Sequence, residues 1–230
     1  MKQVIDRNRI NKYALLANLA SIGGLLILLA SVMLPVFVEG TSALAAILMV
    51  LGLGVAMVGI YYANRWVRKP RPEDRLEKVL KGLSEKYVIF HYPHLPSDHI
   101  LLTPASVIVI ETVNIDGDYM YKDGKWKESM TIGRAIRYIV EEHLGDPSRA
   151  AKESAQNIQA QLNQIEGLTG NIPVKPVVVF THPLARLELV NPPVPVMKVE
   201  KFRKHVDAGT VKMPQEDYDK VAAFLEAKTK

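Results

Sequence analysis

The sequence predicts an α/β domain with a central mixed sheet flanked by helices, preceded by two transmembrane helices. Two observations lead to this fold class. Residues 13–64 contain no Lys or Arg and one acidic residue, Glu39. From residue 73 onward, short apolar runs alternate with amphipathic stretches, which is the order expected when helices pack on a sheet.

The apolar segment divides into two spans, residues 13–38 and 41–62. Each meets the length of about 20 apolar residues that a helix needs to cross the hydrocarbon core. Pro35, Glu39 and Gly40 mark the turn between them, so the two helices form a hairpin that returns to the side on which it began.

Basic residues flank this hairpin and predict its topology. Its connecting turn carries no Lys or Arg, whereas both outer flanks do: Lys2, Arg7, Arg9 and Lys12 before it, and Arg65, Arg68, Lys69 and Arg71 after it. The positive-inside rule then places both termini in the cytoplasm. We therefore expect an integral protein of the cytoplasmic (inner) membrane, with a basic tail at 1–12, a hairpin at 13–64, a basic linker at 65–72 and a cytoplasmic domain at 73–230.

The net charge of +5 belongs to the membrane flanks. Residues 1–71 hold 8 Lys and Arg against 2 acids, which leaves 21 bases against 22 acids for residues 72–230. Such a balanced domain lacks the overall basic footprint of a strong nucleic-acid binder. The chain has no cysteine, which excludes disulfides, zinc–thiolate sites and thiol catalysis.

The soluble domain is expected to follow the order helix, strands, helices, strands, helices. Leu76, Val79, Leu80 and Leu83 have helical spacing, and Asp123-Gly124 is a strong hairpin turn. Asp146 followed by Pro147 is typical of a helix start. The expected helices are 73–85, 132–144, 147–167, 200–206 and 214–227, and the expected strands are 87–92, 98–103, 106–112, 118–122, 125–129, 174–180 and 194–199.

One carboxylate stands out in these strands, because Glu111 ends the apolar run "VIVI". Strand alternation puts it on one face with Val109 and Val113, where an unpaired charge is costly. A metal ion, a cationic partner or hydrogen-bond donors would offset that cost. Asp98, at the start of the preceding strand, is placed to converge with Glu111, and two such carboxylates suit Mg²⁺ and phosphodiester hydrolysis.

The segments "DRLEKVL", "DHILLTPASVIVIETVNIDG" and "KWK", with the long helix after Pro147, resemble the nuclease-related domain, NERD, a branch of the PD-(D/E)xK nuclease superfamily. The resemblance covers about residues 73–205 and implies a restriction-endonuclease-like fold. It implies that Glu77 is the acid of the first helix, Asp98 the metal-binding aspartate and Glu111 the motif acid. It also matches Asn114 and Gly117 to the residues that follow the motif.

The same comparison shows a departure: Val113 stands where the family has its catalytic lysine, and Ala150 occupies the position of a usual glutamine. Valine cannot stabilise developing phosphate charge. The resemblance therefore predicts a membrane-anchored, catalytically degenerate nuclease domain that binds nucleic acid or protein. The alternative is an active Mg²⁺-dependent nuclease whose lysine is displaced to the hairpin, at Lys122, Lys125 or Lys127.

Structural roles remain open beside these functional ones. Asp98 is either a site residue or a turn residue, Glu111 either a metal ligand or a structural partner, and Glu77 either a site residue or an exposed helical residue. Trp126 could stack on a nucleobase, and Lys125 and Lys127 beside it could bind phosphate. More often, however, an aromatic residue in a hairpin packs across the sheet. The clustering of His91, His94 and His99 suggests a metal site, but the three are interpreted as part of an ordinary loop because Pro93 and Pro96 interrupt them.

Overall fold

The computed structural model describes residues 1–129, 143–206 and 212–229. These residues form two compact units. One unit is a helical hairpin of residues 7–71, and the other is an α/β domain made of residues 1–6, 72–129 and 144–230.

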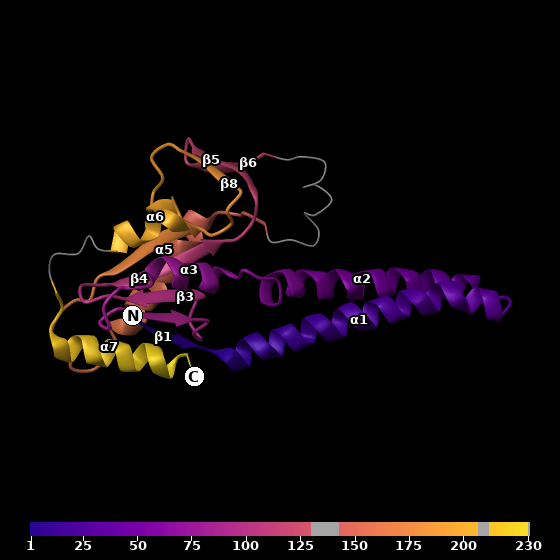
Figure 1. The fold of residues 1–230 in the computed structure, drawn as a ribbon, viewed down its shortest axis with the longest axis horizontal. Coiled ribbons are helices and arrows are strands. Elements are labelled where there is room, and N and C mark those ends of the chain that lie inside the picture. The colour runs from indigo at the N-terminus through magenta and orange to yellow at the C-terminus, as the bar shows by residue number, and fades with distance from the viewer. Residues whose placement is uncertain (130–142, 207–211, 230) are drawn as a thin grey trace. The chain divides into compact units, whose positions relative to one another are not determined.

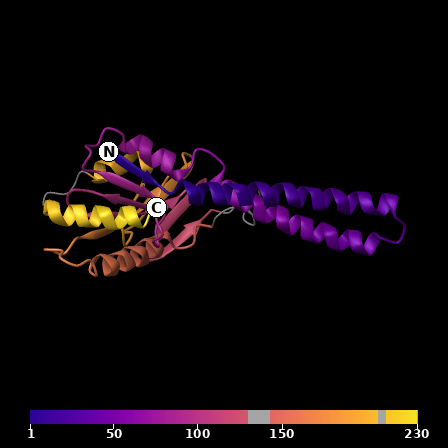
Figure 2. The ribbon, with the colours of Figure 1, turned by 90° about the horizontal axis from the view of Figure 1, so that it is seen from below.

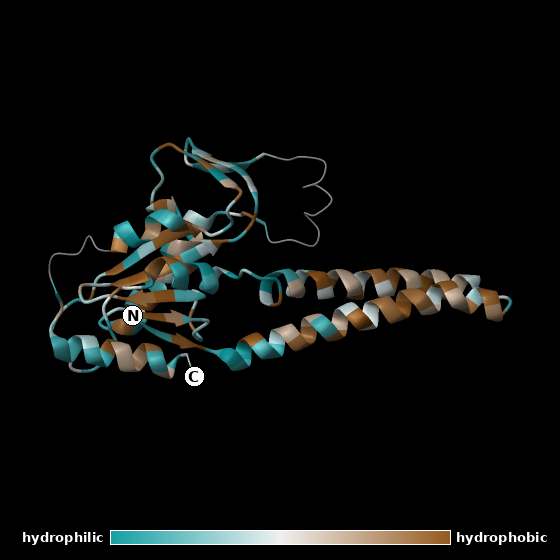
Figure 3. Cartoon of the chain, in the orientation of Figure 1, coloured by the Kyte–Doolittle hydropathy of each residue, from teal (hydrophilic) through white to brown (hydrophobic). Residues whose placement is uncertain are grey.

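The helical unit consists of α1 (Arg7–Phe37) and α2 (Ser42–Trp66). Both are long and apolar enough to cross a membrane, and only 11% and 17% of their most apolar windows are buried. Figure 3 shows hydrophobic residues along most of both helices. The core helix of a soluble protein would hide such residues, so this exposure indicates association with a membrane.

The two helices meet along a seam of mostly small residues spaced seven apart. In α1 the buried residues are Ile10, Ala17, Gly24 and Ser31, and in α2 they are Ala45, Gly52, Gly59 and Trp66. A Cβ atom on Gly24 would lie 2.5 Å from the backbone nitrogen of Ala56, and one on Gly59 would lie 2.5 Å from that of Ser21. Close helix packing therefore depends on these glycines, as is common between helices in membranes.

The α/β domain contains a six-stranded sheet in the order β1-β2-β3-β4-β7-β9 (Figure 1). Strand β4 lies antiparallel to β3 and parallel to β7, so the sheet is mixed, as predicted. The six strands are β1 (Lys2–Ile5), β2 (Val88–His91), β3 (His99–Leu102), β4 (Val107–Val113), β7 (Val174–Phe180) and β9 (Val196–Lys198). The apolar runs of β4 and β7 are neighbouring inner strands of this sheet, as expected of strands covered on both faces.

Helices cover both faces of this sheet (Figure 2). On one face, Val107 and Val109 of β4 pack with α5 (Pro147–Leu162) and α7 (Gln215–Ala227). On the other face, Ile108 and Ile110 pack with α3 (Pro72–Leu80) and α6 (Val199–Val206). The alternating side chains of β4 thus divide the core into two layers.

A smaller sheet has the order β6-β5-β8, made of β5 (Gly117–Lys122), β6 (Lys125–Glu128) and β8 (Ala185–Leu189). The hairpin turn is confirmed: Asp123 and Gly124 both have positive φ, at 53° and 75°. These angles suit a two-residue turn and explain the Asp-Gly pair. Strand β8 is absent from the sequence prediction, because its residues, "ARLEL", follow closely on another strand and carry two charges.

The N-terminus departs from the prediction of a basic tail at 1–12. Residues 2–5 form β1, which pairs in parallel with β2, and α1 begins at Arg7. The α-amino group of Met1 donates to the carbonyl oxygen of Leu83 at 2.6 Å. Consequently the sequence of the α/β domain is interrupted by the helical hairpin, which lies between β1 and α3.

Other boundaries differ from the prediction by a few residues. Helix α3 ends at Leu80, and Gly82 follows with a φ of 89°. Helix α5 ends at Leu162, and its predicted N-cap is confirmed because the Asp146 carboxylate accepts from the Arg149 N–H at 3.0 Å. Most of the expected helix 132–144 lies outside the described residues.

Candidate functional site

The register of four adjacent strands brings the predicted carboxylates to one edge of the sheet. Ile5, His91, His99 and Ile110 lie in a row across β1 to β4. Continuing the β3–β4 register by one residue sets Asp98 opposite Glu111. Strand alternation then turns both side chains toward the face that α5 covers.

Asp98 and Glu111 are both half-buried. The Asp98 carbonyl oxygen accepts from the Tyr92 N–H at 2.6 Å, which fixes the backbone at the start of β3. Carboxylate oxygens are the ligands that Mg²⁺ takes, and an ion held by two of them keeps several water ligands. Among the residues described, no three His, Asp or Glu side chains come together as a metal site.

Val113 ends β4 inside an apolar cluster, and its exposed fraction is 7%. Its neighbours in this cluster include Tyr119, Ala151 and Phe180. The Val113 carbonyl oxygen accepts from the Thr181 N–H at 2.9 Å. A lysine here would have to place its ammonium group among apolar side chains or extend past them, so the environment is adapted to valine.

The two motif residues after Val113 have structural roles. The side-chain oxygen of Asn114 accepts from the Thr181 hydroxyl at 3.0 Å, which links the end of β4 to the end of β7. Gly117 opens β5 with a φ of 134°, a conformation that L side chains rarely adopt.

Glu77 lies on the exposed face of α3, and a different acid on the same helix is buried. Glu73 is only 2% exposed, and it accepts a hydrogen bond from the Tyr92 hydroxyl at 2.7 Å. The sequence contains a signal for this residue, because Glu73, Leu76 and Leu80 have the i, i+3, i+7 spacing of one buried helical stripe.

Two histidines form a buried pair, and the ring of one of them, His99, lies 5.2 Å from that of Tyr92, measured between centroids. Their Nδ1 atoms are 2.8 Å apart, with His91 ending β2 and His99 beginning β3. One Nδ1 atom must donate and the other accept, so the two rings cannot both be in the positively charged form, in which every ring nitrogen is a donor. Burial, and secondarily the charge of His99, hold the pKa of His91 well below its usual value of 6.5. The interpretation as an ordinary loop is therefore wrong for these two histidines.

The hairpin tryptophan packs inside the domain. The Trp126 ring lies 5.3 Å from that of Tyr121 and 5.9 Å from that of Phe180, measured between centroids, and its indole N–H donates to the Ser148 hydroxyl at 3.0 Å. Because strand faces alternate, Lys125 and Lys127 project from the opposite face of β6, and both are exposed. Exposed Lys122 pairs with Lys125 in the β5–β6 register, so it shares that outer face.

Comparison with protein families gives one match. Residues 71–181 match the nuclease-related domain, NERD, a segment that runs from the start of α3 to the end of β7. It contains Asp98, Glu111 and Val113, and it leaves out β1, α6 and α7. No curated protein and no solved structure matches the chain. Residues 71–181 of this chain are therefore similar to the nuclease-related domain, and the two helices before them are long and apolar enough to span a membrane.

Proposed function

We propose that this protein is a membrane-anchored, catalytically degenerate nuclease domain that binds nucleic acid at the cytoplasmic face of the membrane. The observation that carries the proposal is the burial of Val113 in an apolar cluster, at the position where the family has its catalytic lysine. The neighbouring Asp98 and Glu111 are proposed as the remaining metal ligands. In this proposal the domain can still meet a phosphate but lacks the lysine whose charge would stabilise the transition state of hydrolysis.

The hairpin lysines offer little support for a displaced catalytic lysine. Lys122, Lys125 and Lys127 share the outer face of the β5–β6 hairpin, whereas Trp126 and Tyr121 occupy the inner face beside Phe180. Phe180 belongs to the same apolar cluster as Val113. A lysine on the outer face would have to reach around the hairpin to approach Glu111.

The membrane topology is part of this proposal. Basic residues flank both outer ends of the hairpin, and the turn between α1 and α2 contains none. This pattern supports cytoplasmic termini and a cytoplasmic location for the α/β domain.

The test is cleavage and binding by the full chain in lipid nanodiscs, because β1 is part of the domain. Fluorescent DNA and RNA oligonucleotides are incubated with Mg²⁺ or Mn²⁺, and the native chain is compared with Asp98→Ala, Val113→Lys and Val113→Met. We expect binding without cleavage by the native chain. The Met variant controls for a changed side-chain volume at this buried position.

Each result has a definite meaning for the proposal. Activity gained only in Val113→Lys would support a retained metal site that lacks its lysine. Cleavage by the native chain that Asp98→Ala abolishes would establish an active nuclease and contradict the proposal. Absence of oligonucleotide binding would also contradict it and leave a protein-binding role.

A further inference from the structure

A set of basic side chains lies on the outer surface of α3, α6 and the start of β7. Its members are all exposed and are called here the basic face: Lys78, Lys81, Lys175, Lys201, Arg203 and Lys204. Two exposed acids, Glu77 and Glu200, lie on the same helices. On the other side of the sheet, α5 holds two bases and one acid, and α7 holds one lysine and four acids. The near-zero charge of the domain therefore conceals a more positive face on the side of α3 and α6.

Packing fixes the orientation of the basic face. Leu76 and Leu80 of α3 and Phe202 of α6 are fully buried in one cluster against the sheet, which turns the lysines of both helices outward. The two helices are also linked by a hydrogen bond from the Arg203 guanidinium to the Lys81 carbonyl oxygen, at 2.7 Å. The pKa of His205 on α6 is lowered first by partial burial of its ring and second by the charge of Lys175. Lys175 is therefore near α6 and extends the face.

The connections to the helical hairpin leave the domain near the sheet edge that bears Glu111. Asp6 follows Ile5, which lies in the row of His91, His99 and Ile110. Lys175 pairs with Ile108 near the opposite end of β4. Lys81 lies near that end too, because Leu83, two residues further on, accepts from the α-amino group at the start of β1. Lys81 and Lys175 therefore lie toward the end of the sheet opposite to the one at which Asp6 leaves it.

We propose that the basic face binds the phosphate backbone of nucleic acid without sequence preference. The inference rests on the proposed function and adds the surface and the chemistry of recognition. Lys and Arg side chains neutralise phosphates and release condensed counterions, so affinity falls as salt rises. The sequence alone pointed to the lysines of the β5–β6 hairpin. The basic face lies instead on the layer of α3 and α6.

The experiment measures fluorescence anisotropy of a labelled DNA duplex of about 25 base pairs, long enough for several phosphate contacts. The full chain is held in phosphatidylcholine nanodiscs, and salt is varied between about 50 and 200 mM. The test variant combines Lys81→Gln, Lys201→Gln and Lys204→Gln. The matched control combines Lys122→Gln, Lys125→Gln and Lys127→Gln, which removes the same charge from the hairpin.

We expect the test variant to bind roughly 10- to 100-fold more weakly than the native chain. The slope of log affinity against log salt concentration should become shallower by about three, one for each lysine. The control variant should bind within about twofold of the native chain. Thermal unfolding of both variants shows whether the domain remains folded, and none of the six side chains makes a hydrogen bond that the described structure needs.

Three outcomes overturn the inference. Loss of binding in the hairpin variant alone would place the site on the hairpin. Binding that neither variant changes would place it on some other surface. Both outcomes leave the proposed function intact. If the native chain binds no oligonucleotide, the proposed function fails as well. A separate measurement tests for binding to anionic lipid: acylation of these lysines is compared in nanodiscs of phosphatidylglycerol and of phosphatidylcholine. Protection in phosphatidylglycerol alone would show that the face binds the membrane, which would contradict the inference.

Discussion

The buried histidine pair is expected to make the stability of the domain depend on pH. The pKa of His91 is lowered in the folded state, so the unfolded chain binds more protons once the pH falls below about 6.5. The contribution of this group to stability is therefore complete above pH 6.5 and is lost on acidification toward its folded pKa. The melting temperature of the full chain in detergent should fall between about pH 7 and 5.5.

A matched pair of variants isolates this effect from that of His205, whose pKa is also lowered by burial. His91→Gln keeps an amide that can hydrogen-bond to His99 and removes the titrating group. We expect it to flatten the pH dependence of the melting temperature more than His205→Gln does, because the His205 ring is only partly buried. Equal slopes in both variants would contradict the assignment to the buried pair.

The two acids of α3 should differ sharply in their contribution to stability. Glu73→Ala removes the acceptor of the buried Tyr92 hydroxyl, which should lower the free energy of unfolding by about 1–3 kcal/mol. Glu77→Ala changes an exposed side chain on the same helix, with an effect of less than about 0.5 kcal/mol. Denaturant unfolding measures both, and a larger loss in Glu77→Ala would contradict the structural assignment.

Prediction from sequence succeeded where the local pattern is determined by a single physical preference. The Asp-Gly turn and the N-cap at Asp146 follow from backbone conformation and from side-chain capping, whereas the pairing of Asp98 with Glu111 as metal ligands stays a prediction. The buried His91 and His99 could not be assigned in this way, because their environment is created by the β2–β3 register and by packing from α3. The burial of Glu73 could be predicted from its spacing with Leu76 and Leu80, whereas the resemblance to the family assigns the acid of this helix to Glu77.

At the scale of the elements, the seam between α1 and α2 predicts different effects for two adjacent glycines. A methyl group at Gly24 would collide with the backbone of Ala56, so Gly24→Ala should push the helices apart and lower their stability. At Gly23 nothing lies within 4 Å, and Gly23→Ala should be neutral or slightly stabilising because alanine favours helix. Thermal unfolding in detergent distinguishes them, and equal behaviour would show that the helices do not pack along this seam.

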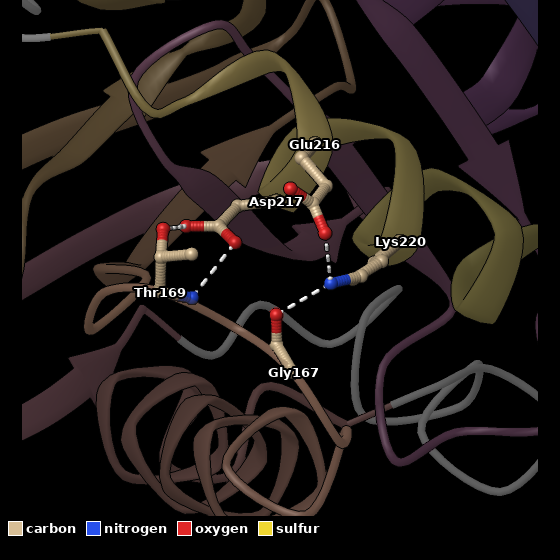
Figure 4. A network of polar contacts seen from close by, with 5 residues as sticks. All are labelled: Gly167, Thr169, Glu216, Asp217 and Lys220. Atoms are coloured by element: carbon tan, nitrogen blue, oxygen red, sulfur yellow. Dashed lines mark hydrogen bonds and ion pairs between the residues drawn. The ribbon is translucent and has the colours of Figure 1, made fainter.

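Helix α7 is held to the segment after α5 by a small polar network (Figure 4). Asp217 accepts from the Thr169 N–H at 2.9 Å and from its hydroxyl at 2.7 Å. Lys220 donates to the Gly167 carbonyl oxygen and pairs with Glu216 at 2.6 Å. The bonds from Thr169 lower the pKa of Asp217 below its usual 3.8, so its contribution is present above that pH and disappears on further acidification.

This network leads to a prediction about the docking of α7. Asp217→Ala removes both hydrogen bonds from Thr169, so we expect faster amide hydrogen exchange in α7 and a lower melting temperature at neutral pH. Asp219→Ala is the control, since this residue is exposed and bonds only to Gln215 within the helix. Unchanged exchange in Asp217→Ala would mean that α7 is held by its apolar contacts alone.

For the whole molecule, the interrupted domain explains a limit of prediction from sequence. The apolar run at 13–64 marks the two helices clearly, and a reader of the sequence naturally starts the soluble domain after them. Strand β1 has only four residues and gains its stability by pairing with β2, a partner more than 80 residues away. No local pattern specifies such a pairing, so residues 1–12 were interpreted as a tail.

The interrupted domain also makes a testable prediction about the smallest stable form of the α/β unit. A fragment of residues 72–230 lacks β1 and exposes the edge of β2, a strand buried along its whole length, and open edges of this kind promote aggregation. Joining residues 1–6 to residue 72 through a flexible linker of about ten residues should restore the edge, because a Gly- and Ser-rich chain of that length spans roughly 16–19 Å. We expect the joined form to be monomeric by size-exclusion chromatography, with a higher melting temperature than the fragment. If the two forms are equally stable and equally monomeric, β1 contributes little to the stability of the α/β unit, even though it pairs with β2 in the sheet.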